Sequence, residues 1–162
     1  MRFAMSCGVA LAVSLLLSDP NVAMAAARPA AVADAPVSVA GEPLFADIVL
    51  RSGRLRGEVR AWMDAGAADR ADFFAGPDYA GFKTRAAELA ALDMQGHVIL
   101  RERGTDGDLK CILRGISEDI PVKLGAVEAA ATAAERRVAL DELHYLLNDN
   151  VEVITAPPQP EV

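Results

Sequence analysis

Two residues of the chain have the types and the spacing for acid–base chemistry: Asp93 and His97, four positions apart. In a helix this spacing places both side chains on one face, together with apolar residues such as Leu89 and Leu100. A carboxylate beside a histidine can orient the imidazole as a general base or as a ligand. The alternative is a helix that bends or ends at Gly96 and leaves both groups at the solvent edge. The sequence places no serine or cysteine nucleophile beside this pair.

A second set of residues contains the minimum ligands for a metal ion or a haem: His97, His144, Met63 and Met94. In an alanine-rich helical protein, however, methionines usually fill gaps in the core. The sequence contains no Cys-x-x-Cys pair, no His-Glu-x-x-His motif, no EF-hand loop and no glycine-rich phosphate loop. We therefore expect no cofactor and no catalytic motif of a known type.

The third candidate is Cys111. The neighbouring apolar residues have helical spacing, which turns Cys111 outward if they face a core. These residues are Leu109, Ile112, Leu113 and Ile116. The other cysteine, Cys7, lies in the predicted export signal, so Cys111 has no partner in the mature chain. We expect an outward thiol that can join two copies of the chain. The alternative is a second helix that covers this face and buries the thiol.

The N-terminal residues have the pattern of an export signal. Arg2 provides a positive charge before an uncharged, mostly apolar run over residues 3–17, which is short for a membrane span. Ala23 and Ala25 then form a small-x-small cleavage site. Residues 1–25 are therefore predicted to be a Sec-type signal peptide, and the protein is predicted to be periplasmic or secreted. The alternative is an uncleaved membrane anchor, whereas a cleaved chain is expected to have no stable membrane insertion.

The composition limits the partners and the fold. The net charge is −7, which disfavours binding to phosphate backbones, so we expect no nucleic acid partner. Hydrophobic residues make up 52% of the 162 residues but aromatic residues only 5%, which favours close-packed helices over a sheet. Residues 26–43 are predicted to be a flexible Ala/Pro-rich linker, 44–154 a helical domain and 155–162 a disordered Pro-rich tail.

The first helix is predicted from Pro43 to about Asp64, with the proline in its first turn. A hairpin over residues 46–61 is an alternative, because charged and small residues alternate in part of this segment. We prefer the helix because its 3.6-residue pattern spans the whole segment. That pattern consists of Leu44, Ile48, Leu55, Val59 and Trp62.

A connection with at most one helical turn is predicted after the first helix, and it carries Phe73 and Phe74. A second long helix begins near Pro77. It either continues to Arg103 or stops near Gly96, and in the second case residues 97–114 form a hairpin.

Three shorter helices are predicted after residue 104. The first follows a capping box formed by Thr105 and Asp108, which argues against the hairpin. Another is expected to begin at Ser117 or Asp119, with Pro121 in its first turn.

The last of these helices is predicted to begin at a capping box formed by Thr132 and Glu135. Its apolar stripe consists of Ala139, Leu140, Leu143, Leu146 and Leu147. The polar residues 148–150 are expected to end it, and residues 151–154 to pack back on the body as a short apolar extension.

Together these patterns predict an all-α fold, a small bundle of about four to five helices. The function expected is that of an exported, non-enzymatic module that binds a protein partner or joins an envelope assembly. The alternative is a helical bundle that binds a ligand, a metal or a haem at a site near Asp93 and His97.

Overall fold

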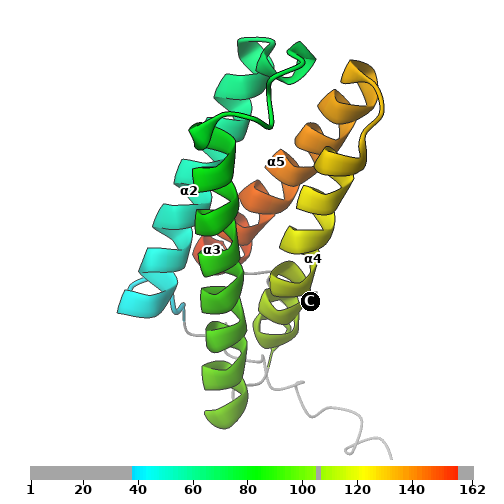
Figure 1. Cartoon of the computed structure of the whole chain (residues 1–162). Helices are drawn as coiled ribbons and strands as arrows, with labels where there is room; N and C mark the ends of the chain where they lie inside the picture. Colours follow the sequence, from blue (N-terminus) through cyan, green and yellow to red (C-terminus); the bar gives the residue numbers. More distant parts are fainter. Residues whose placement is uncertain (1–37, 105–106, 157–162) are drawn as a thin grey trace, which may run out of the picture. The chain divides into compact units, whose positions relative to one another are not determined.

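The computed structural model of the chain describes residues 38–104 and 107–156 (Figure 1). This part consists of four α-helices and a short 3-10 helix and contains no strand, which confirms an all-α bundle and rules out the alternative hairpins over 46–61 and 97–114. The predicted signal peptide, most of the linker and residues 157–162 lie outside it. The elements are α2 (Pro43–Asp64), η1 (Ala67–Asp69), α3 (Pro77–Glu102), α4 (Leu109–Ala129) and α5 (Ala133–Thr155).

The four helices form an up-down-up-down bundle. Each helix runs antiparallel to the one before it, as Figure 1 shows. Helix α2 packs against α3 and α5, and α4 packs against the same two helices, so α2 and α4 lie on one diagonal. The short connections over residues 103–108 and 130–132 favour this topology, whereas the longer one between α2 and α3 contains η1.

All four helices contribute to one core. Helix α2 begins just after Val39, which is itself buried, so the packed body includes residues that precede Pro43. Each helix buries residues three or four positions apart and exposes the opposite face. The largest fully buried side chains are Phe45, Ile48, Leu55, Phe82, Leu89, Leu100, Leu113, Ile120, Leu140, Leu143, Leu147 and Ile154.

Three of the helix starts follow local sequence signals. Pro43 and Pro77 lie in the first turns of α2 and α3, where a missing N–H costs no helical hydrogen bond. At α5, the Glu135 N–H donates to Thr132 Oγ1 (3.1 Å) and the Thr132 N–H donates to the Glu135 carboxylate (3.0 Å). This confirms the predicted capping box. At α4 the side chain of Asp108 makes no capping hydrogen bond, and Thr105 lies outside the described residues.

The predicted break before Pro121 is wrong, because α4 is one helix from Leu109 to Ala129. Ser117 does not cap a new helix. Its hydroxyl donates to the Ala90 carbonyl oxygen of α3 (2.8 Å). Pro121 lies on the exposed face, so the backbone carbonyl that loses its helical partner there is close to water.

The predicted end of the last helix at residues 148–150 is also wrong. Helix α5 continues to Thr155, and Val153 and Ile154 extend its buried face instead of forming a separate segment. Asn150 does not terminate the helix. It is fully buried and forms hydrogen bonds inside the bundle.

Gly96 lies within α3, which passes through it to Glu102 without ending. A Cβ atom at this position would lie 3.1 Å from Leu113 Cδ1 and 3.2 Å from Phe45 Cε1. The glycine therefore lets α3 approach both α4 and α2 closely, and it does not mark a helix end.

Candidate functional site

The sequence candidate Asp93 lies in a buried polar layer at the centre of the bundle. The layer consists of Ser52 from α2, Asp93 from α3 and Asn150 from α5, and all three residues have an exposed fraction of 0%. Asn150 Nδ2 donates to both carboxylate oxygens of Asp93, at 3.1 and 3.0 Å, and to Ser52 Oγ at 3.0 Å. Asn150 Oδ1 is buried and has no hydrogen-bond partner among the described residues.

The polar layer changes the protonation of Asp93. Burial disfavours the charged carboxylate and raises the pKa of Asp93 from its usual 3.8 to about 7, although the hydrogen bond from Asn150 acts in the opposite direction. The carboxyl group therefore keeps a proton well above the pH at which an exposed aspartate loses it. Because this carboxyl is shielded, a substrate has no direct access to it. We therefore assign the polar layer a role in the stability of the fold.

His97 is also buried, one turn further along α3, but it has a different partner. Its Nδ1 lies 2.6 Å from the backbone carbonyl oxygen of Lys110 in α4. Since a carbonyl oxygen only accepts, we assign the hydrogen of this contact to Nδ1. Asp93 and His97 thus lie on one face of α3, as predicted. The Asp93 carboxylate, however, is bound by Asn150, and His97 Nδ1 is bound to the Lys110 carbonyl oxygen.

The metal or haem ligand set proposed from the sequence is spread along the bundle. His97 lies twenty residues into α3, roughly 30 Å along the helix axis from its start, by the rise of 1.5 Å per residue. Met63 lies at the end of α2 that connects to the start of α3. The structure thus does not bring Met63 and His97 together. Among the described residues, no three His, Cys, Asp or Glu side chains are grouped closely enough to hold a metal ion.

Cys111 is exposed on α4, as its helical position predicted, while Leu113 and Ile116 are buried. We expect the thiol to react with a disulfide reagent in the folded protein, at a rate close to that of the urea-unfolded chain, because no packing shields it. The measurement uses the chain without residues 1–25, in which Cys111 is the sole thiol, and Cys111→Ser is the blank. Non-reducing electrophoresis of oxidised protein should then show a dimer. A thiol that reacts only in urea would contradict this expectation.

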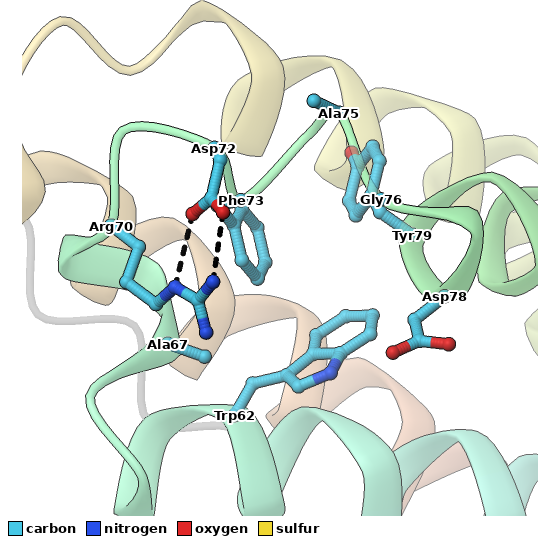
Figure 2. Close-up of a pocket in the computed structure, with 9 residues that line it drawn as sticks. All are labelled: Trp62, Ala67, Arg70, Asp72, Phe73, Ala75, Gly76, Asp78 and Tyr79. Carbon is cyan, nitrogen blue, oxygen red and sulfur yellow. Dashed lines mark hydrogen bonds and ion pairs between the residues drawn. The ribbon is translucent and has the colours of Figure 1, made fainter.

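An open pocket lies around the connection between α2 and α3 (Figure 2). Its volume is about 310 Å³, at the lower limit of the roughly 300–1,000 Å³ that is typical of ligand pockets. We call it the end pocket. Its lining residues are Trp62, Ala67, Arg70, Asp72, Phe73, Ala75, Gly76, Asp78 and Tyr79.

Aromatic rings form one wall of the end pocket. The rings of Trp62 and Phe73 meet edge to face with centroids 5.3 Å apart, and Phe73 and Tyr79 are 5.4 Å apart. Arg136 is not among the lining residues, and its guanidinium carbon lies 4.7 Å from the centroid of Phe74 and 5.9 Å from that of Phe73. The aromatic cluster thus already binds one cation of the chain itself.

Of the three charged residues that line the end pocket, two are paired with each other. Arg70 donates two hydrogen bonds to the carboxylate of Asp72, at 3.0 and 2.8 Å, so these two charges compensate each other. Asp78 lies across the Trp62 ring from Arg70 in Figure 2, and it has no ion pair within the described part of the chain. Burial and the carboxylate of Glu128 raise the pKa of Tyr79, so its hydroxyl stays neutral. The pocket therefore has one negative charge without an ion pair, in the first turn of α3, where the helix N-terminus stabilises a carboxylate.

The sequence candidates do not include this pocket, because most of its residues come from the segment between α2 and α3, which the sequence shows only as a connection. A signal was nevertheless present. The chain has eight aromatic residues, counted as one Trp, two Tyr and five Phe, and five of these eight lie between positions 62 and 82. Such a concentration in an aromatic-poor chain indicates a cluster at one place in the fold.

Comparison with known proteins adds no functional information: no protein-family model, curated protein or solved structure matches the chain. Function is therefore inferred from the geometry of the described residues. Of the two regions with chemistry, the polar layer is closed to solvent and the end pocket is open to it.

Proposed function

We propose that the chain is an exported, non-enzymatic binding protein whose helical body recognises a protein partner at the end pocket. The observation that carries this proposal is the pocket itself, where aromatic rings and an unpaired carboxylate are accessible from solvent. Aromatic residues in a concave site supply large contact areas with little loss of side-chain freedom, and they are enriched among the residues that dominate protein interfaces. A pocket of this size accommodates one anchoring side chain of a partner.

Solvent access favours the end pocket over the face that carries Asp93 and His97. Asp93 is fully buried and bound to Asn150, and a ligand could reach it only if helices separated. The end pocket instead lies on a connection held by α2, η1 and α3, so a partner can bind without disturbing the core. Binding residues are commonly found on such loops, which a rigid scaffold positions.

Export is supported by the sequence pattern of residues 1–25, which lie outside the described part of the chain. Within the described part, no helix has the length and apolarity that crossing a membrane requires. The acidic net charge of −7 is compatible with recognition of a basic partner.

Site-specific photo-crosslinking tests the proposal. A photoreactive amino acid at Ala75, an exposed residue of the pocket wall, is expected to give one discrete protein adduct in the exported fraction of the cells that make this protein. The same material, sequenced from its N-terminus, should begin at Ala26 or Arg28. The matched control is Val122, which is 64% exposed on α4 and outside the pocket lining.

The two crosslinking positions distinguish recognition at the pocket from unspecific contact. An adduct at Ala75 but not at Val122 is expected. Equal labelling from both positions, or no adduct from Ala75, would contradict a binding role for the end pocket. An intact N-terminus recovered from membranes would show that residues 1–25 are an anchor.

A further inference from the structure

We propose that the end pocket binds a basic side chain, lysine or arginine, from the partner protein. This inference rests on the proposed function and specifies the chemistry of the anchor. Such a side chain has a long apolar stem and ends in a cation. The stem matches the aromatic wall of the pocket, and the cation matches its carboxylate. Three independent features of the described residues support this choice.

The first feature is the aromatic surface. A cation is attracted to the face of an aromatic ring, and tryptophan provides the strongest such interaction among the side chains. Trp62 is half-buried and lines the pocket, so part of its ring faces the open volume. The same aromatic cluster already makes such a contact within the chain, because Arg136 lies over Phe74.

The second feature is charge. With Arg70 paired to Asp72, Asp78 supplies the charge that remains in the pocket, and this charge is negative. Asp78 and Trp62 line the same pocket (Figure 2), so a cation bound there has both the aromatic surface and the carboxylate around it. An acidic side chain from a partner would meet repulsion from Asp78, and a neutral one would gain nothing from it.

The third feature is size. The volume of about 310 Å³ suits a single extended side chain better than a folded segment of a partner. The pocket is also open, so the backbone that carries the side chain can remain outside. These properties select a side-chain anchor and not an inserted helix or strand.

Intrinsic fluorescence provides a direct test, since Trp62 is the sole tryptophan of the chain. The probes are capped tripeptides with a central lysine, arginine or acetyl-lysine, the last of which keeps the apolar stem but has no charge. We expect a saturable change in Trp62 emission with the lysine or arginine peptide. Acetylation of the lysine should weaken binding by about fivefold or more, because it removes both the cation–π contact and the attraction to Asp78.

Two variants test whether Asp78 supplies the charge that attracts the peptide's cation. Asp78→Asn keeps the size of the side chain and removes its charge, and it should weaken binding of the lysine peptide by about fivefold. Asp119→Asn makes the same change at an exposed position of α4 outside the pocket and should leave the affinity unchanged. Circular dichroism of both variants checks that the helical fold is preserved.

The outcomes separate this inference from the proposed function. Equal affinity for the lysine and acetyl-lysine peptides, or an unchanged affinity in Asp78→Asn, would overturn the basic anchor even where crosslinking from Ala75 succeeds. Tighter binding of free choline than of either basic peptide would make a small ammonium compound the ligand and would also overturn it. A dimer that dissociates in Asp78→Asn would assign the pocket to a second copy of the chain and would overturn the partner proposed here. Failure of both the peptides and the crosslink would overturn the function as well.

Discussion

Replacing Asp93 by asparagine is expected to remove most of the pH dependence of the protein's stability between about pH 5 and pH 8. Asp93 is fully buried, and its pKa is raised from 3.8 to about 7 in the folded protein. Asparagine has nearly the same shape and cannot ionise. The measurement is the free energy of unfolding in urea, followed by circular dichroism across this pH range.

The sign of the effect follows from the direction of the shift. Below about pH 4 the carboxyl of Asp93 is neutral in both states and its contribution to stability is fully present. Between about pH 4 and 7 the unfolded chain releases the proton that the folded chain keeps, so stability falls as the pH rises. Above pH 7 the buried group also ionises and the loss levels off, at a total on the order of 4 kcal/mol. About 2–3 kcal/mol of this falls between pH 5 and pH 8.

Two controls assign this pH dependence to Asp93. Asp119→Asn removes an exposed carboxylate and should leave the slope of stability against pH unchanged. His97 is a buried histidine of the same helix, so the comparison of the parent protein with Asp93→Asn is repeated in a His97→Gln background. A wild-type protein that becomes more stable from pH 5 to pH 8, or an equal slope in Asp93→Asn, would contradict the prediction.

Local sequence signals mark three of the four observed helix beginnings of this protein. Pro43, Pro77 and the Thr132–Glu135 capping box act locally, through a missing N–H or a side-chain hydrogen bond, and all three mark observed starts. Pro121 was misinterpreted because its local effect is outweighed by packing. The buried residues of α4, on both sides of this proline, continue at spacings of three and four, and one continuous helix buries them all.

Asn150 shows why the polar layer was not predicted. A run of Asn-Asp-Asn resembles a helix end when each residue is considered locally. In the structure Asn150 is in register with Leu143 and Leu147, just as Ser52 is in register with Ile48 and Leu55 on α2. A polar residue within an apolar stripe thus indicated a buried hydrogen bond, but its partners are on other helices and cannot be identified from one helix at a time.

The candidate site was predicted only in part, for a related reason. Helical spacing correctly placed Asp93 and His97 toward the core and Cys111 toward solvent. The end pocket, however, is formed where the connection after α2 folds back on Trp62 and Tyr79. Periodicity gives no information about a connection, and the cavity depends on how that connection packs against two helix ends.

Leu143→Ala is expected to lower the free energy of unfolding by about 2–5 kcal/mol. Leu143 is 1% exposed and lies in the buried stripe of α5, which packs against both α2 and α4. Truncation removes apolar contacts and leaves a cavity that close-packed neighbours fill only in part. The measurement is urea unfolding at a fixed pH, with the midpoint and slope compared between variant and parent.

Leu50→Ala is the matched control, because it makes the same chemical change on α2 at a side chain that is 51% exposed. Most of the area lost at Leu50 was already in water, so its effect should be within about 0.5 kcal/mol of zero. The difference between the two variants then measures burial and not the helix propensity of alanine, which favours both substitutions. A Leu143→Ala variant as stable as Leu50→Ala would place Leu143 at the surface. The rotation of α5 would then differ from the one that buries Asn150 beside Asp93, and the polar layer could not form as described.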